Sequence, residues 1–264
     1  MYNFAYHRPA TVAEAVALMG NMEDGRFLAG GQTLIPTMKQ RLASPSDLID
    51  LSHIPEMKGI REDGDAIVIG AFTCHADVAR SEMLHRRLPA LSRLAESIGD
   101  PHVRNQGTLG GSIANNDPAA DYPGAVLGLE ATVKTDRREI AADDFFTGMF
   151  ETALEPGEIV VSVRFPVPEK ACYAKFPNPA SRYSMAGAFV AKFANAVRVA
   201  ITGAGPTVFR IPDMEAALMK SFAPEALDGI EIDPDGLNND MHGSAEYRAN
   251  LVKVMARRAV EACA

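Results

Sequence analysis

Ala29-Gly30-Gly31-Gln32-Thr33-Leu34-Ile35-Pro36 runs from an apolar strand, through a double glycine, into the start of a helix. Glycine lets backbone N–H groups approach an anion closely, and Thr33 adds a hydroxyl donor. This combination is typical of a turn that binds phosphate. The alternative interpretation is a plain tight turn in which Thr33 caps the following helix.

A second stretch, Thr108-Leu109-Gly110-Gly111-Ser112-Ile113-Ala114-Asn115-Asn116-Asp117, repeats the double glycine with hydroxyls on both sides. Two such turns in different parts of a chain are a stronger signal than one. Each could offer backbone amides to one phosphate of a diphosphate held between them. Because cofactors favour the interfaces between domains, the pair predicts a diphosphate site shared by two units.

Around the first turn, residues 1–55 read as strand–helix–strand–helix–strand. A capping box from Thr11 to Glu14 opens the first helix. Residues 56–168 read as a second α/β unit that contains the second turn. Its end is marked by Pro166 and Pro168, because proline cannot donate a hydrogen bond within a sheet.

Beyond this boundary, residues 169–264 change to strands followed by helices, which indicates an α+β unit with a small antiparallel sheet. We expect strands at 184–193, 197–202 and 207–211, and helices from Asp213 and over 247–262. The stretch 228–244 is polar and reads as a loop.

Charge and composition exclude several classes of protein. The net charge of −8 and pI near 5.3 leave no basic surface for nucleic acid. No apolar run is long enough to span a bilayer, and the N-terminus lacks the features of a signal peptide. Cys74, Cys172 and Cys263 lie far apart, so they indicate neither a disulfide framework nor an iron–sulfur cluster. A reducing cytoplasm fits this cysteine usage best.

Familiar nucleotide and catalytic motifs are missing from the sequence. Gly203-Ala204-Gly205-Pro206 gives only part of a Rossmann fingerprint, and there is no Walker lysine loop. No two histidines are spaced to share a metal on a helix, and no serine sits in a nucleophile elbow. From the residues alone, Asp121 reads as a helix cap and Tyr183 as an aromatic of the sheet core.

The two turns nevertheless resemble a known family. Together with Asp-Pro-Ala-Ala-Asp at 117–121, Asn-Pro-Ala-Ser-Arg-Tyr at 178–183 and Ala-Ile-Thr-Gly-Ala-Gly at 200–205, they look like the FAD-binding medium subunit of molybdenum hydroxylases. This group includes carbon monoxide dehydrogenase and the flavin domain of xanthine dehydrogenase. The resemblance covers nearly the whole chain. It implies an α+β fold: a vanillyl-alcohol-oxidase (PCMH)-type FAD-binding fold of two α/β subdomains, at 1–55 and 56–168. A CO dehydrogenase flavoprotein-like C-terminal domain would follow at 169–264.

The resemblance also implies a set of residues that hold FAD. The first turn and the second turn would wrap the pyrophosphate. Asp121 would bond the ribityl or adenosine side, Val160 would pack beside the flavin, Lys175 would sit near the isoalloxazine, and Tyr183 would lie against the ring system. The implied set is Ala29, Gly30, Gly31, Gln32, Thr33, Leu34, Thr108, Gly110, Gly111, Ser112, Ala114, Asp121, Val160, Lys175 and Tyr183. No side-chain acid or base and no metal ligand is implied.

In such enzymes a large subunit hydroxylates the substrate at a molybdenum centre. Electrons then pass through two [2Fe–2S] clusters of a small subunit to FAD, and on to an external acceptor. The resemblance therefore implies an electron-transfer subunit of a heterotrimer, doubled into a larger assembly. Two alternatives stay open: a stand-alone flavin oxidase or reductase of the same fold, and a scaffold whose flavin site has degenerated.

Overall fold

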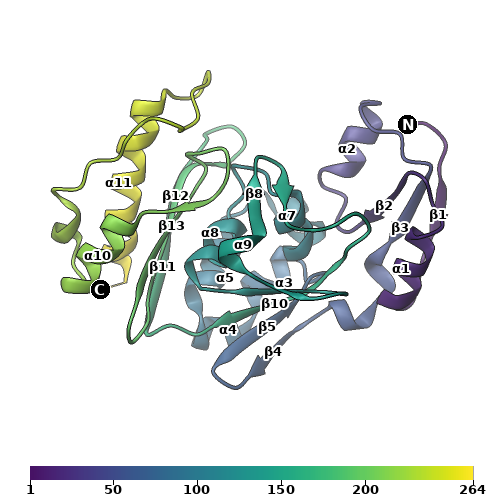
Figure 1. Cartoon of the computed structure of the whole chain (residues 1–264), viewed down its shortest axis with the longest axis horizontal. Helices are drawn as coiled ribbons and strands as arrows, with labels where there is room; N and C mark the ends of the chain where they lie inside the picture. The colour runs from purple at the N-terminus through teal and green to yellow at the C-terminus, as the bar shows by residue number, and fades with distance from the viewer. Residues whose placement is uncertain (264) are drawn as a thin grey trace.

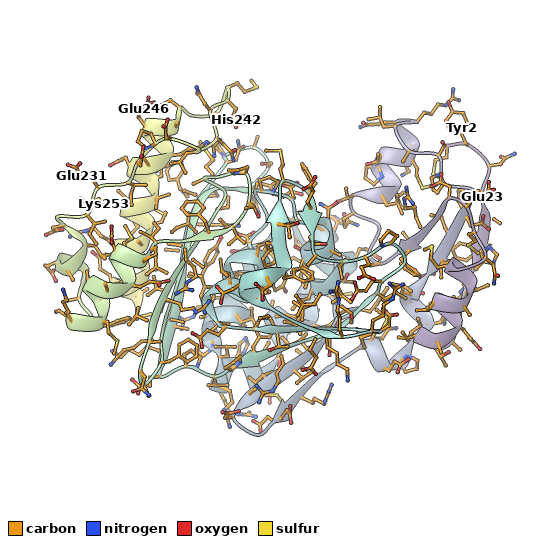
Figure 2. The ribbon with its side chains drawn as sticks, viewed as in Figure 1. Tyr2, Glu23, Glu231, His242, Glu246 and Lys253 are labelled. Carbon is orange, nitrogen blue, oxygen red and sulfur yellow. The ribbon has the colours of Figure 1, made fainter. Side chains whose placement is uncertain are left out.

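The computed structural model describes residues 1–263 and contains three main β-sheets, one after another along the chain, together with one two-stranded hairpin. Figure 1 shows the N-terminal unit in purple at one end, the middle unit in blue and teal, and the C-terminal unit in green and yellow at the other end. In Figure 2, Tyr2 and Glu23 accordingly lie at the opposite end of the molecule from Glu231 and His242. The mixture of helices and sheets agrees with the predicted α+β class.

The N-terminal unit is a small parallel sheet in the order β1 (Ala5–His7), β3 (Asp47–Asp50), β2 (Gly25–Leu28). Parallel neighbours need crossover connections, and α1 (Val12–Met19) and α2 (Leu34–Lys39) provide them. The predicted order of elements is confirmed. The Thr11 hydroxyl accepts from the Glu14 amide at 3.1 Å. The Glu14 carboxylate reaches back to the amide of Ala10, at 2.7 Å, so the expected capping box is closed one residue earlier.

The middle unit has a five-stranded sheet in which every neighbouring pair is antiparallel. Its order is β4 (Ile60–Asp63), β5 (Ala66–Gly70), β10 (Val160–Pro166), β6 (Thr132–Thr135), β7 (Glu139–Ala141). Between β7 and β10 in the chain, β8 (Phe146–Gly148) and β9 (Glu151–Thr152) form a separate short hairpin. The direction of these strands could not be predicted from local patterns, because their pairing joins residues far apart in the chain.

Helices fill the long connection between β5 and β6. They are α3 (His75–Arg80), α4 (Glu82–Arg87), α5 (Pro89–Glu96), α6 (Pro101–Gln106), α7 (Leu109–Asn115) and α8 (Tyr122–Gly128), and α9 (Ala142–Phe145) follows β7. Between His75 and Glu96 the helical stretch is broken into three short helices, α3, α4 and α5. One break falls at Leu88, because the residue before a proline disfavours helical backbone. The other falls at Ser81, whose hydroxyl caps α4 by accepting from the Leu84 amide at 3.3 Å.

The C-terminal unit is an antiparallel sheet, as predicted. Its order is β11 (Lys170–Pro177), β12 (Ser184–Lys192), β13 (Val197–Thr202), β14 (Phe209–Arg210), followed by α10 (Pro212–Lys220), a 3₁₀ turn (Pro224–Leu227) and α11 (Ala245–Ala262). Strand β11 was not predicted, although it forms the longest pairing with β12. Most of the segment 228–244 is irregular, as expected. The boundaries between the three units at 55 and 168 stay a prediction.

The C-terminal sheet is covered on both faces, and this explains why β12 is almost wholly buried. On one face Phe189 packs against α8, where Gly128 leaves room for its ring. On the other face Val190 joins a second core with Leu251 and Met255 of α11. The sheet therefore fixes the C-terminal unit firmly onto the middle unit. Within residues 1–263, no helix is both long and apolar enough to cross a membrane.

Candidate functional site

One cavity of about 610 Å³ brings the two Gly-Gly turns together. The first turn comes from the N-terminal unit, the second from the middle unit, and the loop between β11 and β12 adds a wall from the C-terminal unit. Of the residues predicted from the sequence, all but Lys175 line this cavity: Ala29, Gly30, Gly31, Gln32, Thr33, Leu34, Thr108, Gly110, Gly111, Ser112, Ala114, Asp121, Val160 and Tyr183. Its volume is in the range of small-molecule and cofactor sites.

The first turn presents its backbone to the cavity. Gly31 has φ of +68°, a conformation that favours glycine. A β-carbon on Gly30 would overlap the carbonyl oxygen of Gln106, so glycine is needed there for close approach. Among the described residues, no protein acceptor takes the N–H groups of residues 30–34. The Thr33 hydroxyl makes no capping bond to α2, so the capping interpretation of this residue is wrong. These donors are therefore available to an anion.

The second turn differs, because its N–H groups already have partners inside the protein. Leu109 donates to the Thr73 carbonyl at 3.1 Å, and Gly110 donates to the Ala71 carbonyl at 2.8 Å. Gly111 donates to the Thr108 hydroxyl at 3.1 Å. The sequence led us to expect free amides in both turns. In this structure those amides are occupied, although Thr108, Gly110, Gly111 and Ser112 all line the cavity.

Asp121 is held by a buried hydrogen-bond network from the C-terminal sheet. Its carboxylate accepts from the Tyr173 hydroxyl at 2.5 Å and from Lys175 Nζ at 3.0 and 3.1 Å. Lys175 also donates to the Ser97 carbonyl at 3.0 Å. Asp121 precedes α8 but makes no side-chain cap to it, so the helix-cap interpretation is wrong. Burial raises the pKa of Asp121, while the positive charge of Lys175 acts in the opposite direction.

Tyr183 lies in the loop between β11 and β12, where it lines the cavity and is 51% exposed. The expectation of a sheet-core aromatic, drawn from residue type alone, is therefore wrong. Tyr183 is thus one of the exposed residues at which the cavity meets the surface. Arg182 beside it has φ of +63°, which sets the direction of this loop.

His75 is a cavity residue that the sequence reading missed. The residue is 5% exposed. Its ring lies 5.2 Å from the Tyr122 ring and packs against Gly107, where a β-carbon would sit 2.6 Å from Nε2. Nδ1 is buried without a hydrogen-bond partner. Burial and the nearby charge of Arg104 lower the pKa of His75 to about 4, so the ring is neutral at pH 7. A lone histidine at a helix start gave no signal in the sequence.

Comparison with known proteins decides what kind of site this is. Residues 2–168 match the family described as the FAD binding domain in molybdopterin dehydrogenase. This chain belongs to that family. It is 38% identical over 276 residues to the carbon monoxide dehydrogenase medium chain of Hydrogenophaga pseudoflava, covering 98% of this chain and 96% of that one. It is 36% identical to the nicotine 6-hydroxylase medium subunit of Paenarthrobacter nicotinovorans, covering 97% and 95%.

Solved structures agree with this family membership. Carbon monoxide dehydrogenase from Hydrogenophaga pseudoflava superposes with a TM-score of 0.90 at 37% identity, covering 99% of this chain and 97% of that one. Quinoline 2-oxidoreductase from Pseudomonas putida 86 gives a TM-score of 0.86 at 27% identity, with coverage of 99% and 97%. The chain is thus an FAD-binding medium subunit of the molybdenum hydroxylases, with the α+β FAD-binding fold, and it is an oxidoreductase subunit.

The cavity of this FAD-binding subunit fits its cofactor. The free N–H groups of residues 30–34 suit a negatively charged pyrophosphate, since backbone donors bind phosphate oxygens. Thr108 and Ser112 line the same cavity, and each carries a hydroxyl group, which is a hydrogen-bond donor. The FAD supplies the redox chemistry, and the protein supplies position and electrostatics.

Proposed function

We propose that this subunit is the electron relay of a heterotrimeric molybdenum hydroxylase. Electrons would arrive from the [2Fe–2S] clusters of a small partner subunit and leave the FAD for an external acceptor. A large partner subunit would hold the molybdenum cofactor and the substrate, and two heterotrimers would form the assembly. The support for partners is that the relatives are themselves named as medium chains or medium subunits.

The observation that carries this proposal is the exposure of Tyr183 at the cavity. Tyr183 lines the cavity and is 51% exposed, so a ring system beside Tyr183 would lie close to the surface. A relay needs such access because electrons have to enter and leave through neighbouring groups. The chain has three cysteines, fewer than the four thiolates of a typical cluster, so clusters belong to a partner.

The proposed contacts follow the geometry of the cavity. The turn at 29–34 would hold the pyrophosphate with its free N–H groups, and Thr108, Gly110, Gly111, Ser112 and Ala114 would close over it. Asp121 would bond the ribityl chain and Tyr183 would lie against the ring system. Lys175 would act on the flavin through its ion pair with Asp121, because it does not line the cavity. We also propose the cytoplasm as the compartment, since Cys74, Cys172 and Cys263 are free thiols.

Purification of an affinity-tagged chain from its native host tests the proposal. We expect iron, molybdenum and two further subunits to co-purify with FAD in a constant ratio. Chemically reduced small subunit, mixed with the isolated FAD-loaded chain, should bleach the flavin absorbance. A chain that oxidises a substrate without partners would favour the stand-alone oxidase. A chain that takes up no flavin would favour the degenerate scaffold.

A further inference from the structure

A buried arginine on the outer side of the C-terminal sheet joins the ends of two strands. Arg248 lies in the first turn of α11, which packs on the face of the sheet opposite α8 (Figure 1). One terminal nitrogen of Arg248 donates to the Met185 carbonyl at 2.8 Å and to the Gly203 carbonyl at 3.0 Å. The other donates to the Asp240 carboxylate at 2.8 Å. Because a guanidinium group is planar and donates in fixed directions, it sets the spacing of these three partners.

The first of these carbonyls connects Arg248 to the loop that carries Tyr183. Met185 is the second residue of β12, and Tyr183 comes directly before this strand. The loop is also closed on itself, since the Asn178 amide donates to the Tyr183 carbonyl at 2.7 Å. A shift of Met185 would therefore move Tyr183, which lines the cavity.

The second carbonyl connects the same arginine to another wall of the cavity. The Gly203 amide donates to the Pro118 carbonyl at 2.9 Å, and the Ser184 amide donates to the Ala119 carbonyl at 3.3 Å. Both acceptors belong to the segment 117–121, which lines the cavity at each of its ends. The two strand ends that the arginine joins are therefore also the supports of this wall.

Gly203 makes this junction tight. Its φ of +83° is a conformation that favours glycine. A β-carbon on Gly203 would overlap the Ser184 carbonyl oxygen, so the ends of β12 and β13 touch through their main chains. Arg248 thus bridges two strand ends that are already in direct contact.

We propose that Arg248 is a positioning residue for FAD, because it fixes Tyr183 relative to the segment 117–121 across the cavity. The inference rests on the proposed contact between Tyr183 and the ring system. Within residues 1–263 the cavity lining does not include Arg248, so its effect passes through the main chain that it binds. A wall that is held in place before binding lowers the free-energy cost of binding. Arg248 therefore strengthens FAD binding without touching the cofactor.

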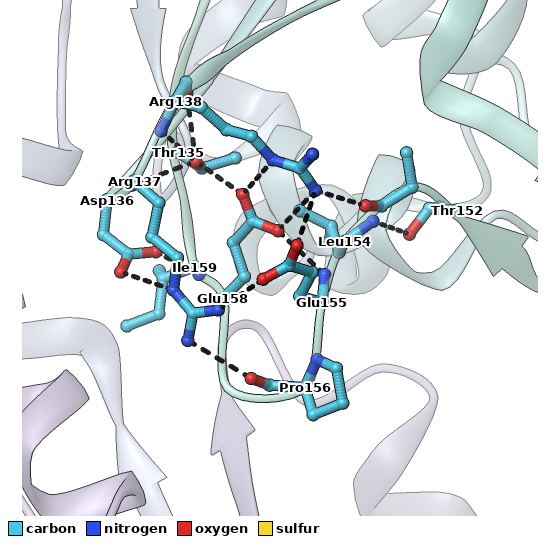
Figure 3. Close-up of polar contacts among 11 residues, drawn as sticks. Thr135, Asp136, Arg137, Arg138, Thr152, Leu154, Glu155, Pro156, Glu158 and Ile159 are labelled. Carbon is cyan, nitrogen blue, oxygen red and sulfur yellow. Dashed lines mark hydrogen bonds and ion pairs between the residues drawn. The ribbon is translucent and has the colours of Figure 1, made fainter.

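A second arginine network beside the cavity provides a comparison, because it holds a different part of the chain. Arg138 Nε donates to the Glu158 carboxylate at 3.0 Å, and a terminal nitrogen of Arg138 donates to the Ala153 carbonyl at 2.7 Å (Figure 3). These partners belong to the middle unit, whereas Tyr183 belongs to the C-terminal unit. Arg138 is therefore the control for an arginine whose effects do not pass through Tyr183.

The test is a double-mutant cycle on the Kd for FAD, measured with flavin-free chain by the quenching of flavin fluorescence. Tyr183→Leu removes the aromatic contact and should raise the Kd about fivefold. Arg248→Met releases Tyr183 and should raise the Kd by a similar factor. In Arg248→Met/Tyr183→Leu the rise should stay well below the product of about 25-fold, because a missing ring cannot be displaced.

The control cycle uses Arg138→Lys, Tyr183→Leu and the double variant Arg138→Lys/Tyr183→Leu. Sites that share no partner act independently, so here the two effects on the Kd should multiply. Urea denaturation of each flavin-free chain measures stability separately from affinity. An arginine with a purely structural role would change stability without coupling to Tyr183.

A wild-type Kd in Arg248→Met, or a double variant at the full product, would overturn the inference. If Arg248→Met does not fold, Arg248→Lys decides in the same way, since lysine keeps the charge beside Asp240 without the planar fork. If Tyr183→Leu leaves the Kd unchanged, the proposed contact between Tyr183 and FAD is wrong, and the inference fails with it. The Tyr183→Leu variant thus distinguishes the two failures.

Discussion

Gly30 lies directly against the carbonyl oxygen of Gln106, with no room between them for a side chain. This contact presses the first Gly-Gly turn onto the segment that leads into the second turn. Ala29 makes a second close approach between the turns. A β-carbon built on Gly111 would lie 3.4 Å from the β-carbon of Ala29. Two turns from separate units therefore pack directly against each other and line one cavity.

Gly30→Ala should separate the two turns and weaken FAD binding by at least about tenfold. The added methyl group meets backbone, which cannot move aside as a flexible side chain can, so we also expect a destabilisation of about 1–3 kcal/mol. Flavin content after purification and urea denaturation measure the two effects. Gly229→Ala is the control, because a β-carbon there meets nothing within 4 Å. Full flavin content in Gly30→Ala would show that the contact does not shape the site.

Lys175→Met should lower the reduction potential of the bound flavin, because it removes a positive charge near the cavity. It also leaves the buried Asp121 carboxylate without its ion pair, which we expect to destabilise the chain by about 3–5 kcal/mol. The double variant Lys175→Met/Asp121→Asn removes both charges and should recover much of that stability. Spectroelectrochemical titration measures the potential, and an unchanged value in Lys175→Met would disprove the proposed role of Lys175.

His75 should make the chain less stable as the pH falls below 6.5. The pKa of His75 is lowered to about 4 in the folded chain, whereas the ordinary value in an unfolded chain is about 6.5. Between these values only the unfolded chain gains the proton, so stability falls as the pH falls, by about 2 kcal/mol at pH 5. His75→Phe keeps a ring without the titration and should flatten this part of the profile. Urea denaturation at several pH values checks it, and identical profiles would contradict the prediction.

Arg198→Met should loosen the C-terminal unit from the middle unit. Arg198 lies on β13 and is only 10% exposed at its side chain. It donates to Glu130 at 2.7 Å and to Asp143 at 2.7 Å. Loss of this bidentate network should cost about 2–4 kcal/mol in the free energy of unfolding. Arg86→Met, at an exposed pair 3.8 Å from Glu82, is the control and should change it by less than about 0.5 kcal/mol. Equal effects of the two substitutions would contradict the prediction.

The sequence predicted features that depend on neighbours along the chain. Gly30 and Gly31 were identified because a double glycine between a strand and a helix is a local pattern, and Thr11 caps its helix for the same reason. The family motif then named the cavity residues, and all of those except Lys175 line the cavity.

Features that depend on distant parts of the chain escaped prediction. The carboxylate of Asp121 is bound by residues of β11, a strand that local patterns did not reveal, so a helix cap was the nearest available interpretation. The antiparallel pairing of β5 with β10 joins residues separated by most of the middle unit. His75 reaches the cavity only because α3 packs beside Gly107.

The flavin content of the purified chain tests the central claim most directly. We predict a yellow protein that releases about one FAD per chain on denaturation, with FAD and not FMN identified by chromatography. The wild-type chain stripped of flavin should regain its colour when FAD is added. A colourless chain that takes up no FAD, even in excess, would contradict the assignment of the two Gly-Gly turns to an FAD-binding electron relay.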